Sequence, residues 1–225
     1  MESAKPSDDL RRVVTSLTNA GWNELFVDAR SLSEAVLSHW AGAVASFFPG
    51  PFTLLTESAT AAQVENLLDS GASRIAVQRR ALEDPNLIAE STRRFGSGSL
   101  AVVVGARREN ESWRVYTGKP GVATEWDAIT WARVAEAQGA AELIVEALPG
   151  ASSDEPYDLE LLSEVARAVA RPVIAFGEPR SVEDCLDALL VGDADAVLLT
   201  PALVSGPRSR EAIRLFLEEH GVSCP

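Results

Sequence analysis

The sequence is poor in the residues from which several classes of site are built. It contains two cysteines and two histidines among 225 residues. Cys185 and Cys224 are too few for a disulfide framework, and neither lies in a metal-binding motif. His39 and His220 have no Cys, Asp or His at ligand spacing. We therefore expect both histidines on the surface, Cys185 buried as a small helix residue, and no metal or cofactor.

Positive charge and long apolar runs are also scarce. Lys and Arg number 20 against 33 Asp and Glu, so the formal net charge is −13. Binding of nucleic acid or of an anionic membrane surface needs clustered Lys and Arg. No apolar run approaches the ~18 residues that would span a bilayer, and the first nine residues are too polar and acidic for a signal peptide. We expect a cytoplasmic protein with no nucleic-acid or membrane partner.

Short apolar runs and amphipathic stretches of helical length alternate along the whole chain. Because most of the apolar runs are continuous, they predict parallel strands buried on both faces. The predicted strands are residues 24–28, 52–55, 74–77, 100–104, 142–146, 172–176 and 195–199. The predicted helices are residues 8–20, 32–47, 59–70, 85–95, 125–138, 159–169, 181–191 and 209–220. Residues 109–116 predict a small hairpin, and the five tryptophans predict packing or interface positions.

An internal repeat indicates which α/β architecture these elements form. Pro51 and Pro172 are 121 positions apart, and so are Glu57 and Glu178. Two similar halves of alternating strands and helices are typical of a TIM-type (β/α) barrel. The sequence thus predicts an α/β fold, a single barrel domain over residues 1–225 with a half-barrel repeat. A doubly wound open sheet is the alternative, but it predicts no such two-fold spacing.

Several stretches carry a family resemblance: GWNELFVDAR from Gly21, LLDSGASRIAVQRRALEDPNLIAESTRRFGS from Leu67, and PYDLELLSEVARAVARPVIAFG from Pro156. Through them the chain resembles the cyclase subunit of imidazole glycerol phosphate synthase, a (β/α)-barrel family of histidine biosynthesis. The resemblance implies a first strand with a catalytic aspartate, followed by a loop with a substrate-binding lysine. This sequence begins at the helix after that strand. We therefore expect seven recognisable strands and eight helices, with the first strand missing.

The residues of the family's site are largely replaced. The second catalytic aspartate corresponds to Pro149, which can neither donate nor accept a proton. The two glycine-rich phosphate turns correspond to residues 56–58 and 177–180, with Glu57 and Glu178 where phosphate would sit. An Asn-Thr pair corresponds to Gln78 and Arg79, and a serine to Pro201. Only Asp28, Gly177 and Thr200 remain family-like, so we expect the two-phosphate substrate not to bind.

The ends of the predicted strands place a set of charged residues at the barrel mouth, where (β/α)-barrel chemistry is built. Two interpretations are open: a new acidic site for a cationic or amine ligand, or a self-neutralising ring of ion pairs. The candidate catalytic residues are Asp28, Glu57, Glu146 and Glu178, and the candidate ligand-binding residues are Arg79, Arg107, Gly177, Arg180 and Thr200.

Three functional hypotheses follow. The first is a degenerate cyclase-like barrel that works as a protein-binding scaffold or regulatory pseudoenzyme. The second is a repurposed lyase or isomerase that uses Glu57, Glu146 and Glu178. The third is a cyclase subunit completed by another chain. A barrel without its first strand would leave two strands without neighbours. We therefore expect a homodimer, or, as the resemblance implies, a glutamine amidotransferase-like partner subunit.

Overall fold

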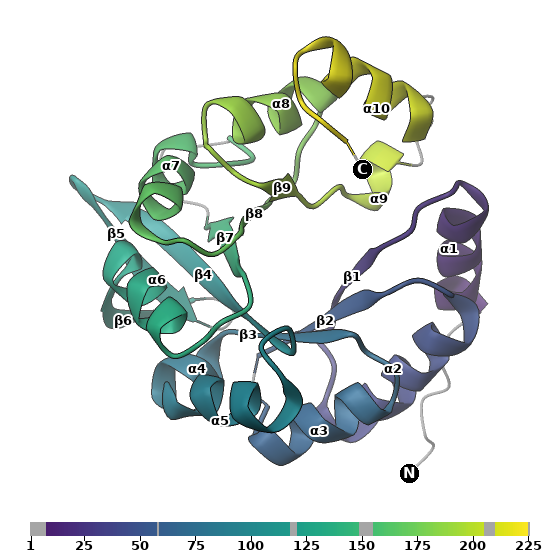
Figure 1. Cartoon of the computed structure of the whole chain (residues 1–225), viewed down its shortest axis with the longest axis horizontal. Helices are drawn as coiled ribbons and strands as arrows, with labels where there is room; N and C mark the ends of the chain where they lie inside the picture. The colour runs from purple at the N-terminus through teal and green to yellow at the C-terminus, as the bar shows by residue number, and fades with distance from the viewer. Residues whose placement is uncertain (1–7, 58, 118–120, 149–154, 205–209, 225) are drawn as a thin grey trace. The chain divides into compact units, whose positions relative to one another are not determined.

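The computed structural model describes residues 8–57, 59–117, 121–148, 155–204 and 210–224. The chain divides into two compact units, Met1–Ala101 and Val102–Pro225. Figure 1 colours the first from purple to teal and the second from teal to yellow. Among the described residues, no helix combines the length and the apolarity that crossing a membrane requires.

The first unit alternates helices with three parallel strands (Figure 1). Leu25 of β1 is in register with Phe52 of β2, and Thr53 of β2 with Arg74 of β3. The carboxyl ends of the three strands therefore lie at one edge of this sheet. The elements are α1 (Asp8–Asn19), β1 (Leu25–Asp28), α2 (Glu34–Phe47), β2 (Phe52–Thr56), α3 (Ala61–Asp69), β3 (Arg74–Val77), α4 (Arg79–Glu83) and α5 (Asn86–Phe95).

The core of this unit forms around β2, which is buried along its whole length. One face each of α2 and α3 is buried as well, with Val44 and Val64 fully inaccessible. Removing so much apolar surface from water is the main stabilising contribution to such a unit. After α3 the chain turns at Gly71, whose φ of +109° is one that side chains rarely adopt; a Cβ there would lie 2.6 Å from the Cβ of Ala45. Glycine therefore allows α2 and α3 to pack closely at this end.

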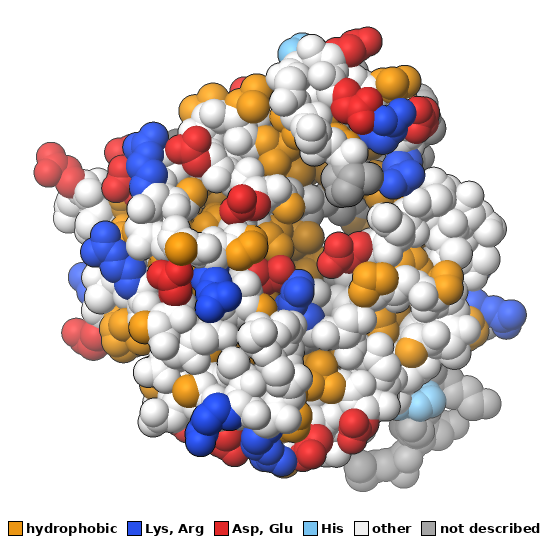
Figure 2. Space-filling model, in the orientation of Figure 1, with side chains coloured by type: hydrophobic (Ala, Val, Ile, Leu, Met, Phe, Trp, Pro, Cys, Tyr) orange, Lys and Arg blue, Asp and Glu red, His pale blue; other side chains and the backbone are white. Residues whose placement is uncertain are grey.

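The second unit is built on four parallel strands with an antiparallel extension (Figure 1). Val102 of β4 is in register with Leu143 of β7, which is in register with Val173 of β8. The strands are β4 (Leu100–Glu109), β5 (Ser112–Thr117), β6 (Val122–Asp127), β7 (Leu143–Ala147), β8 (Val173–Phe176) and β9 (Ala196–Val197). The helices are α6 (Ala128–Ala137), α7 (Leu159–Ala168), α8 (Val182–Leu190), α9 (Pro201–Val204) and α10 (Arg210–Glu219). Figure 2 shows acidic and basic side chains side by side over α10, where Arg214 pairs with Glu211 and Glu218.

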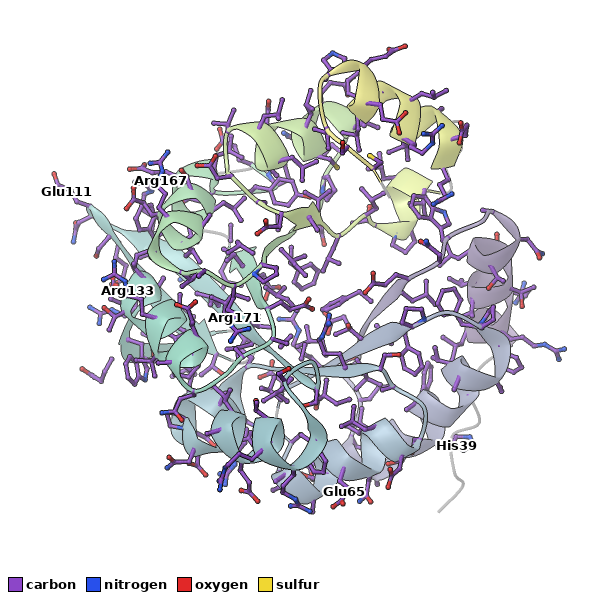
Figure 3. The ribbon with its side chains drawn as sticks, viewed as in Figure 1. His39, Glu65, Glu111, Arg133, Arg167 and Arg171 are labelled. Carbon is purple, nitrogen blue, oxygen red and sulfur yellow. The ribbon has the colours of Figure 1, made fainter. Side chains whose placement is uncertain are left out.

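Side-chain hydrogen bonds connect the β4–β5 hairpin to the start of α7. The indole Nε1 of Trp113 donates to Asp158 Oδ2 at 2.7 Å, and the Arg108 guanidinium bonds both Asp158 and Glu160 while lying over the Trp113 ring. Asp158 also accepts the Leu161 N–H at 3.0 Å, so it caps α7. The tip of the hairpin, with Glu111, projects away from the rest of the unit (Figure 3).

The predicted repeat is confirmed in the helices and strands. Helix α8 begins and ends 121 positions after α3, and β8 begins 121 positions after β2. Each helix is preceded by a capping box: Thr60 with Gln63 before α3, and Ser181 with Asp184 before α8. These two boxes are again offset by 121 residues, so the two halves share both their elements and their local hydrogen bonds.

The α/β, TIM-type fold class is confirmed, since each predicted strand and helix appears, but several boundaries are wrong. The predicted helix 125–138 begins at Ala128, because Asp127 caps it and the preceding residues form β6. Strand β4 continues five residues further than predicted, while β9 has two residues rather than five. The short helices α4 and α9 were not predicted. The single-domain boundary stays a prediction.

The predictions for single residues can also be compared with the structure. His39 is exposed on α2 (Figure 3), His220 is exposed, and Cys185 is fully buried, all as predicted. Trp113 and Trp131 are buried, which agrees with a packing role for these two rings.

Candidate functional site

At the carboxyl edge of β1, β2 and β3, polar residues follow each strand. Asp28 ends β1, Glu57 follows β2, and Gln78 follows β3. Because the strands are parallel and in register, these three residues share one edge of the first unit's sheet. The prediction that Asp28 and Glu57 lie at the same edge of the sheet therefore agrees with the structure of this unit.

Asp28 is bound by Arg30, an arginine whose side chain is buried. The Nε and Nη2 of Arg30 donate to the two carboxylate oxygens of Asp28 at 3.0 and 2.8 Å. Its Nη1 donates to Gln78 Oε1 at 3.4 Å. The Arg30 side chain is 7% exposed, and Gln78 is 2% exposed. This bidentate pairing is a strong, directional form of ion pair, and it removes Asp28 from the residues available as a free base.

Glu57 lies in a different environment from Asp28. The residue is half-buried, and its Oε2 is buried without a hydrogen-bond partner among the described residues. Its backbone carbonyl accepts the Arg80 N–H at 3.3 Å, which links Glu57 to the start of α4. Arg79, the neighbouring ligand-binding candidate, is exposed at the start of α4.

In the second unit the predicted residues follow β7 and β8. Glu146 lies within β7, half-buried and in register with Phe176 of β8. Gly177, Glu178 and Arg180 form the turn between β8 and α8, in which Glu178 and Arg180 are exposed. Pro179 in the same turn has no N–H to donate.

The start of α8 is already occupied by an acidic side chain of this chain. Asp184 Oδ2 accepts the N–H groups of Arg180 and Ser181 at 2.8 and 3.1 Å, and Ser181 Oγ accepts the Asp184 N–H. In the first unit, Gln63 Oε1 likewise accepts the Thr60 N–H at 2.7 Å before α3. Helix N-termini attract anions through such N–H groups. At both turns a side chain of the chain has taken this place, and the spacing of Ser181 and Asp184 already indicates a capping box in the sequence.

The turn after β8 is also closed from one side by residues 156 and 157. A Cβ on Gly177 would lie 2.1 Å from the Pro156 carbonyl oxygen and 3.0 Å from the Tyr157 ring. Tyr157 is buried, and burial raises the pKa of its hydroxyl. Burial likewise raises the pKa of the adjacent Cys185 thiol to about 11, so the thiol is a poor nucleophile at neutral pH. Gly177 therefore serves close packing here.

Of the two remaining ligand-binding candidates, Arg107 and Thr200, only Arg107 lies in another setting than expected. Arg107 was placed at the end of a strand, but β4 continues to Glu109, and the Arg107 guanidinium lies 4.5 Å from the centre of the Tyr116 ring. Its placement at a strand end is therefore wrong, because the hairpin extends the strand past it. Thr200 directly precedes α9, and its carbonyl and hydroxyl oxygens both accept the Leu203 N–H.

Among the described residues, no group of three or more His, Cys, Asp or Glu could hold a metal ion. A hollow of about 420 Å³ lies at the amino end of β8, lined by Arg167, Arg171, Pro172, Asp193 and Asp195 among others; Figure 3 labels its two arginines. It is at the opposite strand end from Gly177. Pro149 and Ser58 lie outside the described residues.

Comparison with known proteins gives these features a context. Residues 12–207 match the family described as "Histidine biosynthesis protein". Imidazole glycerol phosphate synthase subunit HisF of Symbiobacterium thermophilum is 36% identical over 91% of this chain and 77% of its own length. HisF of Prochlorococcus marinus is 30% identical over 95% and 85%. HisF of Dehalococcoides mccartyi is 36% identical over 72% of this chain, and the match spans 64% of that relative's length. This chain belongs to the histidine biosynthesis protein family.

Proposed function

We propose that this protein is a member of its family that does not perform the cyclase reaction and acts by binding another protein, as a scaffold or regulatory subunit. The observation that carries the proposal is the occupation of the two helix N-termini that follow β2 and β8. Asp184 accepts the N–H groups of Arg180 and Ser181, and Gln63 accepts that of Thr60, so these donors are engaged within the chain. A phosphate at either turn would displace these side chains and meet Glu57 or Glu178.

The candidate acid and base positions support the same proposal. The resemblance assigns the second catalytic aspartate to the position of Pro149. Asp28, the remaining family-like carboxylate, is bound by Arg30 through two hydrogen bonds. General acid–base catalysis needs a group that can exchange its proton with the substrate. Neither position offers one.

A protein partner follows from the relatives. The similar proteins are named as subunits of imidazole glycerol phosphate synthase, and the resemblance pairs such barrels with a glutamine amidotransferase subunit. We propose that the partner of this chain is of that kind. Co-expression with such a subunit, followed by size-exclusion chromatography, should give a joint peak; separate elution of the two chains would contradict this part of the proposal.

The central test is thermal unfolding with phosphate or a phosphoribosyl compound at millimolar concentration. A ligand that binds only the folded state at 100 times its Kd adds ~2.7 kcal/mol to the free energy of unfolding, which raises the melting temperature visibly. We expect no shift. We also expect no cyclase turnover, and none in Pro149→Asp, because residues of a catalytic unit act together. Turnover by the wild-type protein would overturn the proposal.

A repurposed enzyme is the second candidate function. The observation that favours it is the buried Oε2 of Glu57, which lacks a hydrogen-bond partner among the described residues. Unsatisfied buried carboxyl groups are concentrated at functional sites. A screen of small metabolites by thermal shift, followed by turnover assays on any compound that binds, separates this candidate from a purely protein-binding role.

A further inference from the structure

Glu57 is unusual among the acidic residues of the first unit because one of its oxygens is buried and unsatisfied. Its Oε2 has no hydrogen-bond partner among the described residues, and no described Lys or Arg forms an ion pair with it. A buried acceptor without a donor costs about 1–3 kcal/mol, and more if it is charged. The structure therefore retains a costly group at the edge where a (β/α) fold places its ligands.

Several donors at this edge of the sheet have acceptors other than the Glu57 carboxylate, although the Nε of Arg80 has none among the described residues. The Arg30 guanidinium is held by Asp28 and Gln78. The Thr60 N–H is taken by Gln63, and the Arg80 N–H by the Glu57 backbone carbonyl. The Arg80 guanidinium lies 3.6 Å from Glu83 and 3.9 Å from Asp84, and its Nε is buried without a hydrogen-bond partner among the described residues.

We propose that Glu57 is the anchor of a binding site for a small ligand with an ammonium or guanidinium group, at the carboxyl edge of β1–β3. Such a ligand brings both the hydrogen-bond donor and the positive charge that the described residues do not supply to Oε2. A phosphate or carboxylate ligand would instead add a second negative charge beside Glu57. The site goes beyond the proposed protein-binding role and does not depend on it.

An unsatisfied binding group leaves a signature in the free protein. Groups kept for binding are often destabilising until the ligand arrives, so their replacement stabilises the folded state. Glu57→Gln removes the formal charge while it keeps the shape of the side chain, and we expect it to raise the melting temperature of the ligand-free protein. A residue with a structural role would give a fall instead.

The experiment measures binding of 1,4-diaminobutane and agmatine to the full chain, by calorimetry and thermal shift at constant ionic strength. Glu111→Gln is the matched control, because it makes the same change at an exposed glutamate at the tip of the β4–β5 hairpin. We expect at least one of the two amines to bind the wild type and Glu111→Gln equally. We expect Glu57→Gln to bind it about ten-fold more weakly or not at all, as the loss of one charge-assisted hydrogen bond implies.

Three results would overturn the proposal. They are the absence of binding by both amines to the wild-type protein, equal binding by Glu57→Gln, and a lower melting temperature of ligand-free Glu57→Gln. The failure of the protein-binding proposal would show itself differently, as cyclase turnover or as a phosphate-induced rise in melting temperature, so the two are distinguishable.

Discussion

At the scale of single residues, Gly177 offers a direct test of how tightly the turn after β8 is packed. Gly177→Ala should reduce the free energy of unfolding by about 1–3 kcal/mol, the usual cost of inserting atoms into a closely packed site. The reason is that the new Cβ would lie 2.1 Å from a backbone oxygen, which cannot move aside as a flexible side chain can. Urea denaturation followed by circular dichroism measures the change.

Gly98→Ala provides the control for this substitution. A Cβ at Gly98 meets no atom within 4 Å, so the free energy of unfolding should change by less than about 0.5 kcal/mol. Equal effects at the two glycines would show that the Pro156–Tyr157 segment does not close on the turn.

Asp158 should make the stability of the protein depend on pH in the acid range. Burial alone would raise the pKa of its carboxyl group, but hydrogen bonds from the Leu161 N–H, the Trp113 indole and Arg108 together hold it below the ordinary value. A carboxyl group with a lowered pKa in the folded state stabilises that state above the ordinary pKa of ~3.9, and this contribution disappears as the pH falls through the folded-state pKa.

The measurement compares melting temperatures of the wild type and Asp158→Asn between pH 7 and pH 3. We expect the difference between the two proteins to be largest near neutral pH and to shrink as the pH falls, because the wild type loses the Asp158 contribution and the variant has none to lose. A difference that is constant over this range would contradict the assignment.

The sequence identified some of the residues of the candidate site but not how they are bonded. Asp28 and Glu57 could be placed together because both follow predicted parallel strands, and the structure confirms that shared edge. The pairing of Arg30 with Asp28 could not be derived in the same way. It depends on which way the chain turns after β1, and an Asp-x-Arg spacing fits many loops. Arg107 was misplaced because hairpin length is set by pairing with a second strand.

At the scale of secondary-structure elements, the two capping boxes should contribute similar amounts of stability. Ser181→Ala removes the hydroxyl that accepts the Asp184 N–H, and Thr60→Ala removes its counterpart before α3. Each should reduce the free energy of unfolding by about 1 kcal/mol, the usual effect of losing an N-cap. Ser97→Ala, at an exposed position outside the helices and strands, is the control and should be nearly neutral.

Urea denaturation of the three variants gives these values. If Ser181→Ala and Thr60→Ala both changed the free energy of unfolding as little as Ser97→Ala does, the capping hydrogen bonds would contribute no stability to the folded state. The proposal that these caps occupy the helix N-termini would then lose its support.

The elements that were predicted well are those with a strong local signal. Strands β2 and β3 are continuous apolar runs, and α3 and α8 carry capping boxes and end near glycine, so their existence and approximate limits follow from the sequence. Strand β6 was missed because its residues, Val122–Asp127, form no continuous apolar run, include no buried residue and run directly into α6. Its extended conformation depends on pairing with β5, which a local pattern does not reveal.

At the scale of the whole molecule, we predict that the purified protein is not a monomer when no partner is present. Among the described residues β9 pairs only with β8, and Leu190 and Val191 at the end of α8 are 52% and 58% exposed. An unpaired strand edge and exposed apolar side chains favour contact with another chain. Size-exclusion chromatography with light scattering should give a mass above that of the 24.0 kDa chain. A monomeric mass at micromolar concentration would contradict the homodimer. Only assembly with a different partner chain would then remain of the proposal.

The 121-residue offset also has a historical meaning. Equal spacing of strands, helices and capping boxes is the trace that duplication of a gene and fusion of its two copies leaves in a protein. Glu57 and Glu178 are then descendants of one ancestral residue, as are Gln63 and Asp184. Within the first pair, Glu57 has a buried oxygen without a hydrogen-bond partner among the described residues, whereas Glu178 is exposed, so one residue type has reached two environments. Within the second pair the residue type has changed while the capping box has stayed.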